Sequence, residues 1–367
     1  MALETGQLRA AAEAAARHVG FDLCGIVDLH GRSIPELSFF SEWIERGHAG
    51  EMTYLEARND AGKFKRASPE ATFPWVRSLI VLALNYNSAA PLSVEVAHNK
   101  AHGWISRYAW SREDYHDVLL RKLRQVDAAL HEFHSSSEGN HQALQTRCYV
   151  DTGPFVERVY AKYAGLGWIG KNTCLISQQV GSWLFLGVIA TSWEFANTPN
   201  AIPLPDRCGS CTRCLDACPT QAFIAPYQMD ATRCISYLTI EKRGSIPPQL
   251  RPQMGNHLFG CDICQDVCPW NRKAPVSTVE EFEPRTGLVN PPLEHFAEMT
   301  REQFQQTFRR SPVKRAKYSG LRRNAAVAMG NSGDPSFIPQ LKRMADDEDP
   351  GVAEHARWAL ERISNPR

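Results

Sequence analysis

The sequence of 367 residues lacks an excess of charge of one sign and lacks long apolar runs. Forty-one basic residues stand against forty acidic ones, so no whole-chain field drives partner binding. No stretch approaches the roughly 18 uninterrupted apolar residues that mark a membrane-spanning helix. The alanine-rich N-terminus is interrupted by Glu13 and Arg17, so it lacks the apolar centre of a signal peptide. The sequence therefore predicts a cytoplasmic protein with no membrane segment.

Cysteine is plentiful instead, with eleven copies. Structural disulfides are rare in a cytoplasmic chain, so clustered cysteines favour a metal centre. Eight of them fall within residues 207–270, a segment with little hydrophobic periodicity that needs such a centre to fold. Cys24, Cys148 and Cys174 lie in apolar, strand-like segments, where we expect ordinary buried thiols.

Four of the eight clustered cysteines form the run C-x2-C-x2-C-x3-C-P, which is typical of bacterial ferredoxins. In that arrangement three thiolates hold one [4Fe–4S] cluster and the fourth crosses to a second cluster, so a second set of four is required. The second set is present, although a long loop follows its first cysteine. The crossover assigns one cluster to Cys208, Cys211, Cys214 and Cys268, and the other to Cys218, Cys234, Cys261 and Cys264. Structural zinc is the alternative, and the Cys-Pro endings disfavour it.

The hydrophobic pattern predicts three units along the chain. Residues 1–200 alternate helix-like and apolar strand-like segments, which indicates an α/β or α+β domain. A proline-rich linker at 197–206 leads into a ferredoxin-like double-cluster unit at 201–275. Residues 276–367 pair helices through short Gly, Asp and Pro turns, as HEAT-like repeats do, and such repeats present one face to a partner.

Within the first unit, two features guide the expected fold. Segments 173–177 and 182–190 are predicted to pair as strands across a turn. Residues 165–170 spell G-x-G-x-x-G, and Lys171 extends them to a near match of the P-loop. Both phosphate-binding motifs need a strand before the glycines and a helix after them, whereas here a helix precedes and a strand follows. We expect these glycines to end a helix and to let the backbone approach a flat group.

Three stretches carry a resemblance to a known family: GEMTYL (50–55), ISRYAWSREDYH (105–116) and VDTGPFVERVYAKYAGLGWIGKNTCLI (150–176). Together with the cysteine pattern and the HEAT-like tail, they make nearly the whole chain resemble epoxyqueuosine reductases. The resemblance implies a cobalamin enzyme with two [4Fe–4S] clusters. It implies the last step of queuosine biosynthesis, in which epoxyqueuosine is reduced to queuosine at the wobble position of tRNAs with GUN anticodons, through contacts to the anticodon loop.

Asp151 is the proton donor that the resemblance implies. Converting an epoxide to an alkene takes two electrons and two protons, and the oxygen leaves poorly without a general acid. We expect burial beside a corrin to raise the pKa of Asp151 and so keep a proton available. A helix cap at Asp151 or Thr152, ahead of Pro154, is the alternative.

The resemblance also implies contacts to a base-off cobalamin, although core packing explains the apolar members equally well. The residues implied are Arg58, Arg107, Tyr108, Asp151, Leu175, Ile176, Ile235 and Ser236. Asp114 and His116 begin the D-x-H-x-x-G motif that places a histidine under cobalt in some cobalamin enzymes, but the glycine is missing. We therefore expect no lower histidine ligand, and we interpret His116 as a polar residue at a helix start.

A basic window at 309–323 holds seven basic residues and no acidic one. Such a window, with Tyr318 inside it, suits contacts to phosphate and to an unstacked base, while a solvated helix surface is the alternative. The predicted tRNA contacts are Lys242, Arg243, Lys314, Arg315, Lys317, Arg322 and Arg323.

Two other functions remain open from the residues alone. A corrinoid reductive dehalogenase acting on a small molecule carries a similar cysteine pattern, but the missing export signal and the basic helical tail disfavour it. A non-catalytic ferredoxin-type electron carrier would not need 200 residues before its clusters. The reductase requires a low-potential electron donor, which the sequence does not identify, and nothing in the sequence predicts more than a monomer.

Overall fold

The computed structural model describes residues 5–29, 34–67, 72–137, 143–195 and 203–365. Most of the predicted linker at 197–206 therefore lies outside the described residues. A four-stranded antiparallel sheet organises the N-terminal half, in the order β1-β2-β7-β4. Its strands are β1 (Leu23–Asp28), β2 (Ser78–Asn85), β7 (Leu184–Thr191) and β4 (Thr146–Tyr149).

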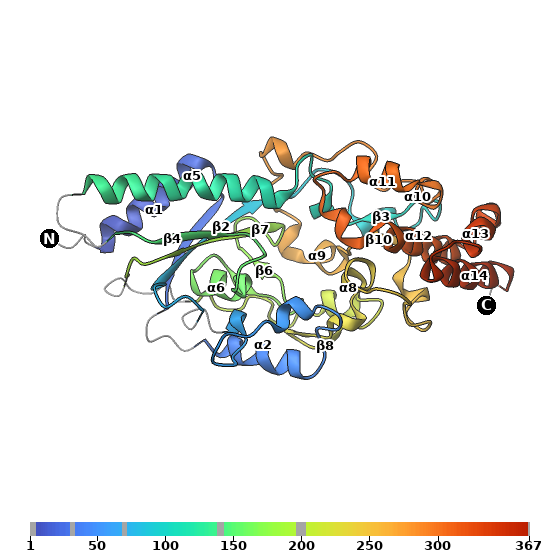
Figure 1. Cartoon of the computed structure of the whole chain (residues 1–367), viewed down its shortest axis with the longest axis horizontal. Coiled ribbons are helices and arrows are strands. Elements are labelled where there is room, and N and C mark those ends of the chain that lie inside the picture. The colour runs from blue at the N-terminus through green and yellow to red at the C-terminus, as the bar shows by residue number, and fades with distance from the viewer. Residues whose placement is uncertain (1–4, 30–33, 68–71, 138–142, 196–202, 366–367) are drawn as a thin grey trace.

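Helices cover both faces of this sheet (Figure 1). On one face lie α1 (Thr5–Val19) and α5 (Tyr115–Ser136), and on the other lies α6 (Glu157–Tyr163). Because β2 is central and covered on both sides, all eight of its residues are buried, which explains its continuous apolar sequence. The apolar residues of α5 recur at helical spacing and point into the same core as α1.

The predicted pairing of segments 173–177 and 182–190 is wrong. The short strand β6 (Leu175–Ile176) pairs instead with β5 (Trp168–Ile169), while β7 pairs with β2 and β4. A single bridge, between Ser177 and Gly181, closes the turn that connects the two segments. Gly167 permits the observed arrangement, because a Cβ at that position would lie 2.1 Å from the carbonyl oxygen of Ile176.

The cysteine-rich segment is built from short elements joined by turns. They are α7 (Arg213–Asp216), β8 (Phe223–Ala225), β9 (Gln228–Met229), α8 (Ile235–Ile240), β10 (His257–Phe259) and α9 (Ile263–Asp266). Strand β10 pairs in parallel with β3 (Trp104–Ile105) from the first half of the chain. Residues 104–110 consequently lie in one hydrophobic core with the C-terminal helices.

The C-terminal segment is helical, and its last helices lie at one end of the molecule (Figure 1). Its elements are α10 (Leu293–Glu298), α11 (Arg301–Thr307), η8 (Pro312–Ala316), α12 (Tyr318–Ser332), α13 (Ile338–Ala345) and α14 (Pro350–Ser364). Asp349 caps α14 by accepting from the amides of Gly351 and Val352. In the described part of the chain, no helix is both long enough and apolar enough to cross a membrane.

Candidate active site

The eight clustered cysteines gather into two groups. Burial, together with the charges of Cys268, Cys208 and Cys211, raises the pKa of Cys214 to about 11, so these four thiols are neighbours. In the second group, burial and the charges of Cys234 and Cys218 raise the pKa of Cys261. Hydrogen bonding with Cys174 and burial raise the pKa of Cys264, and the charges of Cys261 and Cys234 raise it further. These groups agree with the crossover sets. A cluster would remove the cost of ionising such thiols, because ligating thiolates are deprotonated.

Backbone and indole N–H groups surround the sulfurs, as they do in iron–sulfur sites. The amide of Ala222 donates to the Sγ of Cys218 at 3.3 Å. Burial raises the pKa of Cys208, and the indole of Trp168 opposes this by hydrogen bonding to the sulfur. The Nε1 of Trp168 is buried and lies near this sulfur.

The glycine motif that resembles a P-loop holds the cysteine loops in place. Lys171 donates from Nζ to the carbonyl oxygens of Gly209 at 2.6 Å and Cys211 at 3.0 Å. Asn172 donates to the carbonyl oxygen of Cys264 at 3.2 Å, so two adjacent residues contact both cysteine sets. Gly165 ends α6 with φ +82°, as expected. We expected the glycine backbone to approach a flat group. Gly167 lies against the backbone of Ile176 instead.

Replacing Lys171 with methionine is expected to loosen the first cysteine loop, because two carbonyl groups lose a charged donor. The free-energy cost should be about 1–2 kcal/mol. Iron release to a chelator should accelerate about 5–30-fold. The matched control is Lys273→Met, at an exposed lysine of the same unit. Equal iron release from both variants would contradict this role.

Asp151 lies in a loop with a left-handed backbone, at φ +57°. A non-glycine residue adopts this conformation at a cost, so the surrounding contacts must hold it there. Its amide donates to Oε1 of Glu157 at 2.8 Å, and its carbonyl accepts from Nη2 of Arg66 at 3.0 Å. Arg66 also donates to the carbonyl of Phe155 at 3.1 Å. The loop from 151 to 157 is therefore fixed at both ends.

The carboxylate of Asp151 faces the start of α5. Its Oδ2 accepts from the hydroxyl of Tyr115 at 3.2 Å and lies 3.6 Å from Nε2 of His116. Hydrogen bonding to His116 lowers the pKa of Asp151 to about 2, against the effect of burial. The expected rise in pKa is thus wrong, because the half-exposed carboxylate has a cationic partner. The cap alternative also fails, because α6 begins after Val156 and receives no side-chain cap.

The other family stretches converge on this carboxylate. Burial and the charge of Asp151 raise the pKa of Tyr108, and burial raises that of Tyr54, where the charge of Asp151 also contributes. The guanidinium of Arg315 lies 5.0 Å from the ring centre of Tyr54, and its charge lowers the pKa of Asp151. Residues from GEMTYL, ISRYAW and the basic window thus surround one place.

A buried aspartate that sequence reasoning missed links this place to the cysteines. Asp262, next to Cys261, accepts from Nε1 of Trp104 at 3.0 Å and from the amide of Arg107 at 2.7 Å. It also binds the hydroxyl of Ser106. The segment that carries Tyr108 is therefore attached directly to the second cysteine set. The sequence signal that could have identified Asp262 is its position between two cysteines of the pattern.

Several residues expected to contact cobalamin are buried in protein instead. Leu175 is 4% exposed, Ile176 is 1% exposed and Ile235 is 2% exposed, so their side chains pack in the protein core. Burial of the side chains does not bear on the expected approach of the backbone after the glycine turn, so the contacts to cobalamin stay predictions. Arg107 is also buried and donates to the carbonyl oxygens of residues 88, 90 and 91, so it fastens a loop.

The remaining candidates keep accessible surface. Arg58 is exposed, with its guanidinium 3.8 Å from the ring centre of Phe64. Tyr108 is half-buried. Ser236 is half-buried too, and its amide and hydroxyl both hydrogen-bond to Cys234. Ser236 thus lies at the second cysteine set and Tyr108 near the Asp151 carboxylate.

The predicted tRNA contacts also divide into side chains that are buried or paired and side chains that are exposed. Arg323 is buried and donates to the carbonyl oxygens of Leu238, Lys242 and Gly244, so the prediction of phosphate contact is wrong for it. Arg322 is 15% exposed and forms an ion pair with Asp347. Two positions in the cluster loop are also engaged: Lys242 pairs with Glu51, and Arg243 donates to the carbonyls of residues 240, 315 and 316. Exposed basic side chains remain at 314, 315 and 317.

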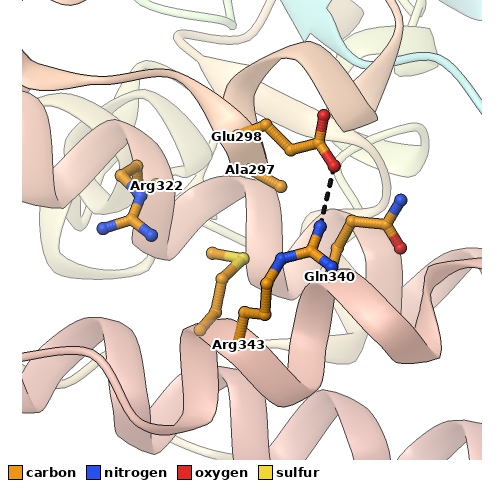
Figure 2. Close-up of a pocket in the computed structure, with 6 residues that line it drawn as sticks. Ala297, Glu298, Arg322, Gln340 and Arg343 are labelled. Carbon is orange, nitrogen blue, oxygen red and sulfur yellow. Dashed lines mark hydrogen bonds and ion pairs between the residues drawn. The ribbon is translucent and has the colours of Figure 1, made fainter.

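Arg322 faces a cavity of about 360 Å³ between α10, α12 and α13. Figure 2 shows Arg343 bonded to Glu298 across this cavity, with Gln340 beside them. The lining residues are Ala297, Glu298, Arg322, Gln340, Arg343 and Met344. The cavity belongs to the C-terminal helices, whereas the exposed residues Lys314, Arg315 and Lys317 lie just before α12, and the charge of Arg315 acts on Asp151.

These features define an oxidoreductase class: a double [4Fe–4S] segment attached to an α+β domain that presents an acidic residue. A family model described as "4Fe-4S double cluster binding domain" matches residues 207–271, and one described as "Epoxyqueuosine reductase QueG" matches residues 66–152. The epoxyqueuosine reductase of Pseudomonas aeruginosa is 39% identical over 353 residues, covering 94% of this chain and 92% of the relative. The chain belongs to the epoxyqueuosine reductase family.

Solved structures agree with this assignment. A crystal structure of epoxyqueuosine reductase with a tRNA-Tyr epoxyqueuosine-modified tRNA stem loop superimposes with a TM-score of 0.83 at 30% identity. The superposition covers 99% of this chain and 92% of the other. The Bacillus subtilis enzyme, with its catalytic Asp loop swung out of the active site, gives a TM-score of 0.82 at 30% identity over the same shares.

Proposed function

We propose that this chain reduces epoxyqueuosine in tRNA to queuosine, with Asp151 as the proton donor to the epoxide oxygen. The observation that carries the proposal is the fixed loop that presents the Asp151 carboxylate, in a chain of this family. The Bacillus subtilis relative is described as having a catalytic Asp loop, which supports this choice. Nucleoside mass spectrometry tests it, after incubating cofactor-loaded protein and a chemical reductant with epoxyqueuosine-containing tRNA. Queuosine is the expected product.

Cobalamin is proposed as the cofactor beside Asp151. Tyr54, Tyr108 and Ser236 offer rings and hydroxyls with accessible surface, which suits a corrin and its amide side chains. Both ring nitrogens of His116 face carboxylates, so His116 does not serve as a lower ligand, in agreement with a base-off cofactor. When bound, the clusters would supply single electrons and the corrin a low-valent cobalt. Arg58 and Ser236 would help to hold the corrin.

The residues of the chain have separate tasks in this proposal. Asp151 gives a proton to the departing oxygen, which otherwise leaves as a poor alkoxide. Arg66 and Glu157 hold the loop so that the carboxyl stays aimed at the substrate. The hydroxyl of Tyr115 donates to Oδ2 of Asp151 and orients it. Tyr108 closes the same place against water, because its ring packs on Tyr115 and Phe259.

For tRNA we propose contacts from the exposed basic residues before α12, to the anticodon loop of tRNAs with GUN anticodons. Lys314, Arg315 and Lys317 lie on η8 or at its end, in the part of the basic window nearest to Asp151. The wobble nucleotide must leave the stack to reach the reacting centre, so backbone contacts beside that centre are needed.

Replacing Lys314 and Lys317 together with alanine is expected to weaken tRNA binding. Two phosphate contacts are lost, so the slope of log Kd against log salt should fall by about 2. KM should rise while kcat stays unchanged. The control pair is Lys273 and Lys342, both exposed and outside the window. An unchanged slope would locate the RNA elsewhere.

We further propose that the protein acts as a cytoplasmic monomer that takes electrons from a low-potential donor. Its three parts would be a cobalamin-binding catalytic domain at 1–200, a ferredoxin-like unit at 201–275 and a HEAT-like, tRNA-binding unit at 276–367. The stacking of α12 with α13 and α14 supports the last assignment. Residues 104–110 nevertheless share a core with the last part, which couples the parts mechanically.

A further inference from the structure

The proposed reaction consumes more protons than one carboxyl group holds. An epoxide, two electrons and two protons give an alkene and one water, and both protons end on the same oxygen. Asp151 holds one proton at most. A second group on the protein must therefore supply Asp151 between the two transfers, unless bulk water reaches a site that has to exclude it.

His116 is placed to supply that proton. Its Nε2 lies 3.6 Å from Oδ2 of Asp151, and its Nδ1 lies 2.8 Å from Oδ1 of Asp114. Asp114 is the N-cap of α5 and also accepts from the amide of His116, so both the backbone and the ring are fixed. The ring stacks on Tyr115 with centres 4.0 Å apart. The imidazole thus bridges two carboxylates in a defined orientation.

We propose that His116 is the proton store of the site, oriented by Asp114 and delivering protons to the substrate oxygen through Asp151. This inference rests on the proposed function. His116 does not touch the substrate in this scheme, so it is a positioning and proton-supplying residue. The glycine of the D-x-H-x-x-G pattern is absent, and the structure gives the Asp-x-His pair a different task.

The proton balance of the two steps is as follows. At neutral pH the resting pair is an Asp151 carboxylate and a His116 imidazolium, because their pKa values are about 2 and about 9. The His116 proton passes to Asp151 and from Asp151 to the oxygen as the first carbon–oxygen bond breaks. After His116 has been reprotonated, a second transfer by the same route protonates the hydroxyl as the second carbon–oxygen bond breaks, and water leaves. The two electrons come from the low-potential donor and end in the carbon–carbon double bond. Solvent reprotonates His116 after each transfer, because the His116 side chain is 32% exposed.

The charges around the pair agree with a stored proton on His116. Burial lowers the pKa of His116, but hydrogen bonds to Asp114 and Asp151 outweigh it and raise the pKa to about 9. The pKa of Asp114 is lowered: burial opposes this, and hydrogen bonds from His116 prevail. The other groups that act on His116 or its partners are Tyr108, Tyr115, Glu157, Arg66, Arg285 and Arg315.

Tyr115 is the competing donor, because its hydroxyl contacts the same carboxylate oxygen. Burial and the charge of Asp151 raise its pKa well above the usual value, so it releases a proton poorly at neutral pH. Its ring is stacked on Phe185 with centres 4.3 Å apart, which gives it an orienting role. His116 is therefore the better proton source.

The first test is the pH profile of His116→Gln. Wild-type kcat should fall on the alkaline side with a midpoint near 9, where His116 loses its proton. The variant should lose this limb, and its kcat at neutral pH should fall about 10–100-fold with an unchanged KM. Burial raises the pKa of Glu157 to about 8, so Glu157→Gln is measured in parallel and should retain the limb. The matched control is His18→Gln, an exposed histidine on α1.

The second test is chemical rescue with a readout of the free protein. Added imidazole should restore His116→Ala at least tenfold and leave Asp151→Asn unchanged. In histidine-labelled protein, NMR titration should give His116 a pKa near 9 that falls in Asp114→Asn. A His116→Gln enzyme with wild-type kcat and limb, or a His116 pKa near 6.5, would overturn the inference. Failure of the wild type to convert epoxyqueuosine would instead refute the proposed function, since the NMR titration does not depend on it.

Discussion

Turnover of epoxyqueuosine tRNA is expected to fall by about 10²–10⁴-fold in Asp151→Asn, because the amide cannot give a proton to the departing oxygen. The two groups have the same shape, and the contacts to the Asp151 backbone come from Arg66 and Glu157. The fold, the iron content and the tRNA affinity should therefore be retained. The measurement is single-turnover conversion alongside iron content and tRNA binding.

The control for this substitution is Asp117→Asn. Asp117 is an exposed aspartate in the first turn of α5, close in sequence to His116. Its replacement should leave conversion within about twofold of wild type, since exposed charges contribute little. Undiminished conversion by Asp151→Asn would remove Asp151 as the proton donor. Equal losses in both variants would point to a general effect on α5.

Loss of one cluster is the second large effect, and Cys218→Ala is the sharpest way to produce it. Cys218 belongs by sequence to the first run, but its charge acts on Cys234 and Cys261 of the other set. The variant should keep about four of eight irons, lose the second cluster and lose turnover. Cys268→Ala should show the opposite, with loss of the first cluster despite its place in the second run.

Cys148→Ser is the matched control for the cysteine variants. Burial raises the pKa of Cys148 to about 12, and it lies in β4 outside both sets. Its replacement should keep all of the iron and cost about 1 kcal/mol of stability at most. Selective loss of the first cluster in Cys218→Ala would contradict the crossover.

The double-cluster segment was predictable from the sequence because the spacing of its cysteines is local and typical of such clusters. The helices and central strands were predictable because their periodicity reports burial directly. The pairing of β6 was not, because two residues of strand carry too little pattern and Gly167 alone permits the approach to Ile176.

Long-range contacts explain what sequence reasoning missed at the site. Leu175, Ile176 and Ile235 follow functional motifs in sequence, and the fold packs their side chains in the core. Arg323 reads as part of a basic window, yet the fold surrounds it with backbone carbonyls. The pKa of Asp151 depends on His116, which lies on another element and has no sequence signal linking it to Asp151.

The most direct test of the central claim is a single-turnover assay. Protein purified without oxygen and loaded with iron and cobalamin is mixed with a limiting amount of epoxyqueuosine-containing tRNA and reductant. Nucleosides are then quantified by mass spectrometry. The account predicts stoichiometric queuosine in the tRNA. Recovery of intact epoxyqueuosine from protein that retains about eight irons and one cobalamin would contradict it.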